Sequence, residues 1–252
     1  MIKAQSITKQ ILMGKGVGTL YGVSVGTGDP ELITVKGQRL LQQVPVIAFP
    51  LGVNGKEGLA QTIITPWITA QQKKLPLYFP YLQDKKVLQK AWQQAAKMVW
   101  SYLSQGIDVA FACEGDVSFY STFTYLAQTL KKDYPQLPIQ TVPGVSSPMA
   151  AASVLGLPLT LGSQNLAILP ALYNVAELDE VLSWADVIVL LKVSSVYTQV
   201  WQKLDTLNLL DCAFVVERAN QSEEKIYQNL RDHPTINLSY FSIMIISLGQ
   251  NQ

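Results

Sequence analysis

The sequence predicts an α/β protein of two lobes, with mostly parallel or mixed sheets and a cleft between the lobes. Short apolar or β-branched runs alternate with helix-like patterns along the chain, which is typical of strands connected by helices. Three of these runs end in a loop of small residues, and a helix-like pattern follows each loop directly. The chain has 252 residues, 48% of them hydrophobic, which is enough for one large or two small domains.

Eight runs predict strands, and the clearest helix pattern covers residues 84–105. That helix has apolar residues near a 3.6-residue period, Asp84 as its cap and Gly106 as its stop. The polar, proline-containing segment 131–138 is the predicted linker, so the N-terminal lobe covers residues 1–134 and the C-terminal lobe 139–252. The predicted strands are 20–25, 44–49, 109–113, 139–142, 166–169, 187–191, 213–216 and 241–247.

The three strand, loop and helix segments are residues 20–32, 109–126 and 140–155. Glycine at the end of a strand lets a ligand approach the backbone closely, and the start of the next helix offers unpaired N–H donors. Three such segments in one chain predict a single bound small molecule.

Charge and composition argue against several classes of partner. Nineteen basic and eighteen acidic residues give a net charge of +1 without a basic stripe, so nucleic acid is not an expected partner. No apolar run reaches the roughly 18 residues that cross a bilayer, so we expect no membrane partner. Cys113 and Cys212 lack the spacing of metal ligands, so we expect neither a metal site nor a disulfide. The N-terminus lacks the features of a signal peptide, which predicts a cytoplasmic protein.

Two familiar phosphate-binding motifs fail on spacing. Gly22, Gly26 and Gly28 give G-x-x-x-G-x-G rather than the G-x-G-x-x-G of dinucleotide sites, and no G-K-[ST] follows them. The first loop ends instead in Asp29 and Pro30, before a helix predicted to start near Glu31. Asp29 can cap that helix and Pro30 suits its first turn, so both residues also have a purely structural interpretation.

The residues of the three loops together resemble the tetrapyrrole methylases. Residues 22–30, with Leu32, Thr34 and Lys36 after them, are similar to the G-x-G-P-G-D-P-x-L-L-T-x-K opening of that family. Residues 114–122 resemble its G-D-P loop, and their Y-S-T continuation is similar to the branch that methylates precorrin-2, or its cobalt form, at meso carbon 20. The resemblance runs from about residue 18 to the C-terminus and includes residues 143–147, 168–171, 215–219 and 243–249.

This resemblance implies the tetrapyrrole methylase fold, with the cofactor held between the lobes, and a homodimer. It implies a methyltransferase of cobalamin biosynthesis that uses S-adenosylmethionine and methylates precorrin-2 or cobalt-factor II at carbon 20. A sister methylase acting on another ring carbon, and a non-catalytic binder of the cofactor or of a tetrapyrrole, are the alternatives. The residues that it implies for the cofactor are Thr27, Glu114, Gly115, Asp116, Phe119, Ser121, Thr122, Ser146, Ser147, Pro170 and Ala219.

The substrate residues that we expect are Gly28, Asp29, Pro30, Tyr78 and Tyr120. No motif identifies a catalytic base, and the candidates in decreasing order are Asp116, Tyr120, Glu114 and Asp84.

Hydroxyls that precede helices commonly cap them, so N-capping is the alternative role for Ser121, Thr122 and Ser146. Tyr78 lies in LPLYFPYL, residues 75–82, whose prolines predict an ordered loop or a strand at a sheet edge.

Three positions depart from the family's pattern. Thr27 and Val117 stand where the first and second loops usually carry proline, which predicts freer loops. Residues 49–51, Phe-Pro-Leu, replace the aspartate-containing pattern of the uroporphyrinogen methylases, which argues against that reaction.

Overall fold

The computed structural model describes residues 16–52, 55–80, 84–170 and 175–248, and the chain divides into two compact units, Met1–Val145 and Ser146–Gln252. Tyr81 and Ala171, which belong to predicted motifs, lie outside the described residues. In the part of the chain that is described, no helix is both long and apolar enough to cross a membrane.

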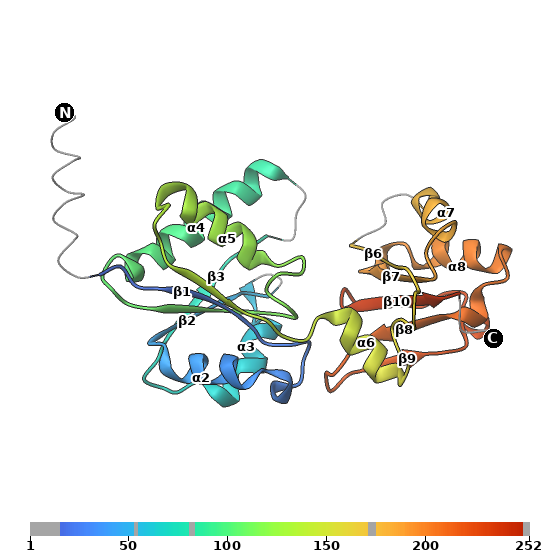
Figure 1. Ribbon diagram of the computed structural model, residues 1–252, viewed down its shortest axis with the longest axis horizontal. Coiled ribbons are helices and arrows are strands. Elements are labelled where there is room, and N and C mark those ends of the chain that lie inside the picture. The colour runs from blue at the N-terminus through green and yellow to red at the C-terminus, as the bar shows by residue number, and fades with distance from the viewer. Residues whose placement is uncertain (1–15, 53–54, 81–83, 171–174, 249–252) are drawn as a thin grey trace. The chain divides into compact units, whose positions relative to one another are not determined.

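The first unit is a parallel five-stranded sheet with helices on both faces (Figure 1). The strand order is β3-β2-β4-β1-β5. Helices α2 and α3 pack on one face and helices α4 and α5 on the other, over two separate apolar clusters. The strands are β1 (Leu20–Ser24), β2 (Val46–Pro50), β3 (Lys73–Leu77), β4 (Val109–Cys113) and β5 (Ile139–Val142), and the helices are α2 (Val35–Gln43), α3 (Leu59–Ile64), α4 (Lys85–Leu103) and α5 (Thr122–Asp133).

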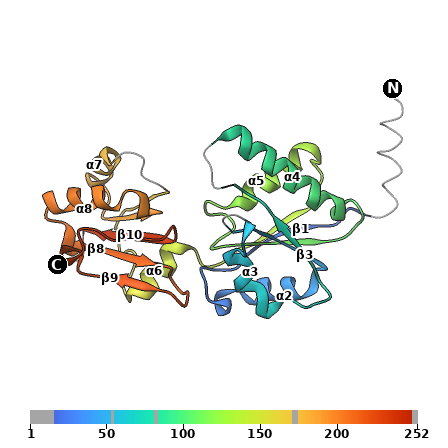
Figure 2. The same cartoon turned by 180° about the vertical axis from the view of Figure 1, so that it is seen from behind.

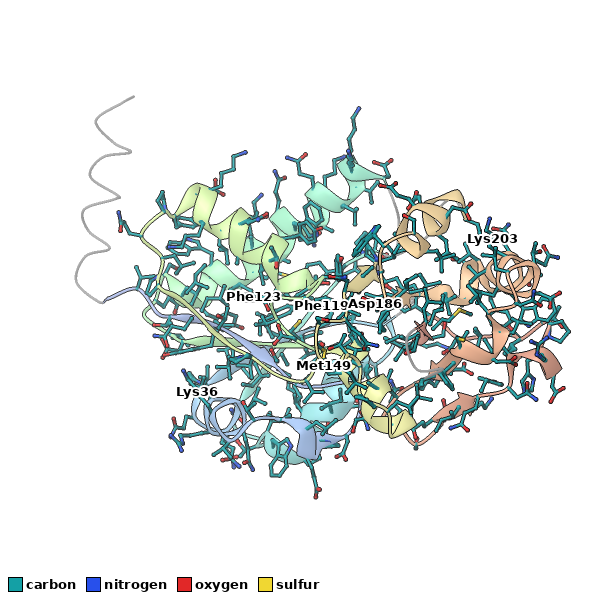
Figure 3. The ribbon with its side chains drawn as sticks, turned by 45° about the vertical axis from the view of Figure 1, so that its right-hand side comes forward. Lys36, Phe119, Phe123, Met149, Asp186 and Lys203 are labelled. Carbon is teal, nitrogen blue, oxygen red and sulfur yellow. The ribbon has the colours of Figure 1, made fainter. Side chains whose placement is uncertain are left out.

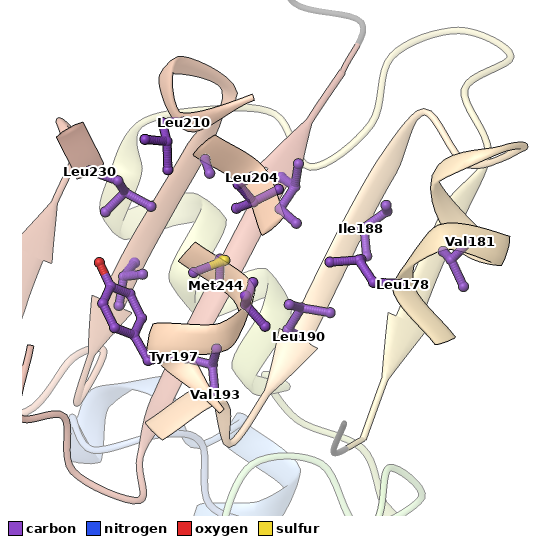
Figure 4. Close-up of a cluster of buried hydrophobic side chains, with 14 of the residues drawn as sticks. Leu178, Val181, Ile188, Leu190, Val193, Tyr197, Leu204, Leu210, Leu230 and Met244 are labelled. Atoms are coloured by element: carbon purple, nitrogen blue, oxygen red, sulfur yellow. The ribbon is translucent and has the colours of Figure 1, made fainter. Parts of the chain in front are cut away.

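The second unit is a mixed five-stranded sheet in the order β6-β7-β10-β8-β9, seen from both sides in Figures 1 and 2. β6 and β7 are parallel, and β10 runs antiparallel to both β7 and β8. Figure 4 shows the main core of this unit, which α7 and α8 cover. The elements are β6 (Leu166–Leu169), β7 (Val187–Leu191), β8 (Ala213–Glu217), β9 (Lys225–Tyr227), β10 (Ser242–Ser247), α6 (Ser147–Leu155), α7 (Ala176–Leu182) and α8 (Tyr197–Thr206).

Local sequence signals account for much of this architecture. The eight predicted strands are present, and four of them have the predicted bounds. Helix α4 begins where its cap predicted, because Asp84 Oδ1 accepts the N–H groups of Lys86 and Val87 at 2.8 and 3.2 Å. Gly106 follows the helix in the left-handed region, at φ +78°.

Three expectations require correction. Residues 131–138 are not the division between the units, because β5 pairs with β1 inside the first sheet and the division falls at Val145–Ser146. The helix expected near Glu31 is only a 3₁₀ turn, Pro30–Leu32, and α2 begins at Val35 with Thr34 as its cap. β9 was not predicted, because it is a short edge strand with mainly exposed side chains. The prolines of residues 75–82 predicted an ordered loop or a strand at a sheet edge, and β3 is an edge strand that includes residues 75–77.

Candidate functional site

The connections of the first sheet leave in opposite directions from the neighbouring strands β1 and β4. These two strands are neighbours, yet β1 continues into α2 on one face and β4 into α5 on the other. In parallel α/β sheets, ligands bind beyond the carboxyl ends of the strands at this kind of topological switch point. The loops after β1 and β4 therefore form the candidate site, and they are the first two loops that the sequence singled out.

The two loops are joined to each other by their glycines. Gly115 N donates to Gly26 O at 2.7 Å and Gly26 N donates to Gly115 O at 3.3 Å. Both glycines have positive φ, +76° at Gly26 and +65° at Gly115, which side chains rarely tolerate. A Cβ at Gly115 would meet no atom within 4 Å, so open space faces the backbone there.

The rest of the first loop has a visible structural role. Asp29 Oδ1 accepts the N–H of Glu31 at 2.8 Å and caps the 3₁₀ turn, in which Pro30 takes the first position. Thr27 is buried, with 8% of its surface exposed, whereas Gly28 is partly exposed. The structure thus places the predicted residues 27–30 together beside the Gly26–Gly115 bridge.

Asp116 connects the second loop to the segment after β5 and lies close to Ser24 at the end of β1. Its Oδ2 accepts the Gly144 N–H at 2.8 Å and its Oδ1 accepts the Ser118 N–H at 2.8 Å and the Ser118 hydroxyl. Burial by itself would raise the pKa of this carboxyl, but the hydrogen bonds from Ser118 and Gly144 outweigh it and hold the pKa below the ordinary value. Asp116 is therefore an ionised carboxylate whose oxygens are occupied, which is unsuited to accepting a proton.

Ser24 is the residue that sequence reasoning missed. It is fully buried at the end of β1, where its Oγ donates to Val142 O at 2.7 Å and accepts the Val117 N–H at 2.8 Å. The hydroxyl also lies 3.5 Å from Asp116 Oδ2. Ser24 therefore links β1, β5 and the second loop, and the only sequence signal for it was a polar residue inside an apolar strand.

Val117 does not give the freer loop that was expected. Its side chain is buried, and its N–H donates to Ser24, a bond that the family's usual proline would not make.

Glu114 lies at the end of β4, between Cys113 and the bridging Gly115. Its Oε1 accepts the N–H of Ala60, in the first turn of α3, at 3.3 Å. Burial raises the pKa of this carboxyl, and the Ala60 hydrogen bond offsets only part of the increase. Two acidic residues of one loop therefore have opposite pKa shifts.

The residues after the second loop divide between structural and exposed positions. Ser121 is buried and caps α5, because its Oγ accepts the Phe123 N–H at 3.0 Å and also contacts Cys113 Sγ at 2.8 Å. Thr122, half-buried, is the first residue of that helix. Phe119, which Figure 3 labels with Phe123, is partly buried and contacts Tyr120 edge-on at 4.7 Å between ring centroids.

Tyr120 combines an exposed side chain with a strained backbone. Its side chain is 58% exposed and its φ is +50°, a conformation that costs a non-glycine residue roughly 1 kcal/mol. Strain of this kind often accompanies function. Tyr78, the other predicted aromatic contact, is 57% exposed after β3, at the same edge of the sheet but two strands away from β4.

The remaining predicted residues belong to the second unit. Ser146 precedes α6 without capping it, because its hydroxyl contacts Met149 Sδ at 2.9 Å instead. Ser147 is the first residue of α6. Pro170 follows β6 and Ala219 follows β8, which places both at the same edge of the second sheet.

The residues on either side of Ala219, Arg218 and Asn220, both have positive φ. Ala219 therefore lies in a sharply turning loop, and its side chain is buried.

Comparison with known proteins identifies the class to which this fold and site belong. The sequence pattern of the tetrapyrrole (corrin/porphyrin) methylases matches residues 19–233, and the chain belongs to this family.

Among its relatives, the cobalt-precorrin-2 C(20)-methyltransferase of Salmonella typhimurium is 30% identical over 234 residues, which cover 91% of this chain and 96% of that protein. The cobalamin biosynthesis protein CobIJ of Mycobacterium tuberculosis is 31% identical over 243 residues, which cover 93% of this chain. The chain spans only 47% of the length of CobIJ.

A solved structure of uroporphyrin-III C-methyltransferase from Thermus thermophilus, complexed with S-adenosyl homocysteine, has the same fold. Its TM-score is 0.64 at 19% identity, and the match covers 91% of this chain and 92% of that one.

Proposed function

We propose that this protein transfers the methyl group of S-adenosylmethionine to meso carbon 20 of precorrin-2 or of its cobalt form, in cobalamin biosynthesis. Family membership supports methyl transfer, and the Salmonella relative that matches nearly end to end supports the choice of acceptor and position. The observation that carries the proposal is the Gly26–Gly115 bridge at the switch point. Gly115 belongs to the loop whose Y-S-T continuation resembles the carbon-20 branch.

The described residues suit this cofactor chemically. S-adenosylmethionine has an adenine face, a ribose diol and a zwitterionic tail, but no phosphate, so its site needs backbone groups, hydroxyls and apolar walls. The open space at Gly115 allows close approach to the backbone, and Phe119 offers an apolar wall. Bound S-adenosylmethionine supplies an already activated methyl group, so the protein's task is to align the acceptor and exclude water.

We assign Asp116 and Ser121 to shaping the cofactor loop rather than to direct contact, because their polar atoms are occupied within the protein. Thr27, Gly115 and Phe119 are the contacts of the first unit that we favour. The predicted contacts in the second unit, Ser146, Ser147, Pro170 and Ala219, stay predictions that rest on the family resemblance.

The proposed activity is tested with the purified protein, S-adenosylmethionine and three separate acceptors: precorrin-2, its cobalt form and uroporphyrinogen III. We expect mass spectrometry to show the gain of one methylene unit on precorrin-2 or its cobalt form, with an equal amount of S-adenosylhomocysteine. Comparing the two forms also determines whether metal insertion precedes methylation. Methylation of uroporphyrinogen III alone would contradict the proposal, and cofactor binding without turnover would indicate a non-catalytic binder.

Tyr120 is expected to provide an aromatic surface for the flat substrate, since its exposed ring stands at the site and its backbone is strained. Replacing Tyr120 with glycine should keep the free energy of unfolding within about 1 kcal/mol of the wild-type value, because relief of backbone strain offsets the lost ring contact. The KM for the tetrapyrrole should rise about tenfold, which corresponds to 1.4 kcal/mol of binding. The matched control is Asn208→Gly, at an exposed residue with φ +56°, and equal KM values in both variants would exclude this role for Tyr120.

The family resemblance also supports a cytoplasmic homodimer, which we propose as the working assembly. Sedimentation of the purified protein tests the dimer, and cell fractionation tests the location.

A further inference from the structure

Glu114 has a carboxyl group at the candidate site that is only partly engaged in hydrogen bonds within the protein. Alternate residues of β4, Val109, Phe111 and Cys113, face the core under α4 and α5, so Glu114 belongs to the opposite face, where it meets α3. Oε1 accepts the Ala60 N–H at 3.3 Å. Its other oxygen has no hydrogen-bond partner among the described residues, and no described lysine or arginine forms an ion pair with this carboxylate. One oxygen is thus anchored and the other is available.

The surroundings of Glu114 favour proton transfer. The side chain is partly exposed next to Gly115, where open space faces the backbone. Burial raises the pKa of the carboxyl toward the range in which a carboxylate is an effective base near neutral pH.

The other nearby groups are less suitable. The carboxylate of Asp116 is engaged by Ser118 and Gly144. Burial raises the pKa of the Cys113 thiol to about 12, so this group stays protonated. Asp84 caps α4.

We propose that Glu114 is the base that accepts the proton leaving carbon 20 of the tetrapyrrole, an inference that rests on the proposed methyl transfer. An electron pair of the substrate's conjugated system forms the new bond from carbon 20 to the methyl carbon, while the bond from that carbon to sulfur breaks and leaves its electrons on sulfur. Carbon 20 then carries both hydrogen and methyl, and the ring system carries the positive charge. Glu114 takes the proton, and the electrons of the C–H bond restore the conjugation and neutralise the ring.

The direct test is Glu114→Gln, which keeps the volume and the acceptor for Ala60 but removes the basic oxygen. We expect kcat to fall about 100-fold, the usual contribution of a positioned base. The dissociation constant of S-adenosylmethionine should stay within about threefold of the wild-type value, a difference of under 1 kcal/mol. Glu57→Gln is the matched control, because Glu57 is an exposed carboxylate shortly before α3, and its kcat should equal that of the wild type.

A kinetic isotope effect separates proton transfer from a structural role. With deuterium at carbon 20, the isotope effect on kcat should be larger in Glu114→Gln than in the wild type, because loss of the base makes proton removal slower than methyl transfer. Formate should also restore part of the activity of Glu114→Gly by supplying a carboxylate from solution.

Each alternative outcome has a definite meaning. A loss of activity with an unchanged isotope effect and no rescue by formate would show that Glu114 has a structural role. Weaker cofactor binding with unchanged kcat would show that Glu114 is a cofactor contact. Either result overturns the proposal. Normal activity of Glu114→Gln overturns it as well, while the methyl transfer stands. If the wild type itself methylates neither form of precorrin-2, both proposals fall.

Discussion

Replacing Asp116 with alanine is expected to destabilise the first unit by about 2 to 5 kcal/mol and to abolish methyl transfer. The change leaves the N–H groups of Gly144 and Ser118 without their acceptor and removes the link between the loops after β4 and β5. The Gly26–Gly115 bridge loses its support at the same time, because Asp116 is the next residue in the chain. Urea unfolding followed by circular dichroism measures the stability, and Asp133→Ala, at an exposed residue of α5, is the control.

The loss of unfolding free energy in Asp116→Ala should also depend on pH. The folded carboxyl has a lowered pKa, while the unfolded one has its ordinary pKa of 3.8. Its stabilising effect is therefore complete above pH 3.8 and disappears as the pH falls through the lower, folded pKa. The difference in unfolding free energy between wild type and Asp116→Ala should be constant near neutral pH and shrink below pH 3.8. A difference that does not change with acid would show that the carboxylate's charge is unimportant.

Gly22→Ala is expected to destabilise the first unit by about 1 to 3 kcal/mol, as overpacking of a core usually does. Gly22 lies in the middle of β1 and faces α5. A Cβ there would lie 2.6 Å from the ring of Phe123 and 2.8 Å from Val117 Cγ2, both far closer than contact distance. The ring is buried in the core beside Phe111, with 5.8 Å between the two ring centroids, so it has little room to move away.

A double-mutant cycle isolates this clash. Phe123→Leu removes the ring edge that the new methyl group would strike, so the double variant should be more stable than the sum of the single changes implies, by about 1 kcal/mol. Gly16→Ala is the control, because a Cβ there meets no atom within 4 Å. Strict additivity of the two single changes would show that the strain lies elsewhere.

Strand and helix positions could be predicted where a local signal was strong. Strands 109–113 and 187–191 are fully buried and read as continuous apolar runs, and α4 carries its own cap at Asp84. β3 was predicted only as one of two alternatives, an ordered loop or an edge strand, since the prolines at Pro76 and Pro80 are compatible with both. Only its pairing with β2 makes it a strand.

The candidate site was predictable as a set of loops but not as a set of roles. Gly26, Gly115 and their neighbours were marked by composition, and the structure joins them through two backbone hydrogen bonds. Glu114 and Asp116 stand two residues apart and differ by one methylene, so no sequence rule separates them. Their opposite pKa shifts have different causes in the folded chain. Burial raises the pKa of Glu114, whereas hydrogen bonds from Ser118 and Gly144 outweigh burial at Asp116 and lower its pKa.

The sequence by itself determined the α/β class, the three strand, loop and helix segments and the resemblance to one family, because these depend on neighbours within a few residues. Tertiary structure decided the strand order, the division at Val145–Ser146 and the switch point between β1 and β4. It also made Ser24 a buried link and replaced the expected freedom at Val117 with a hydrogen bond. These features depend on contacts between residues about ninety positions apart, which only the folded chain brings together.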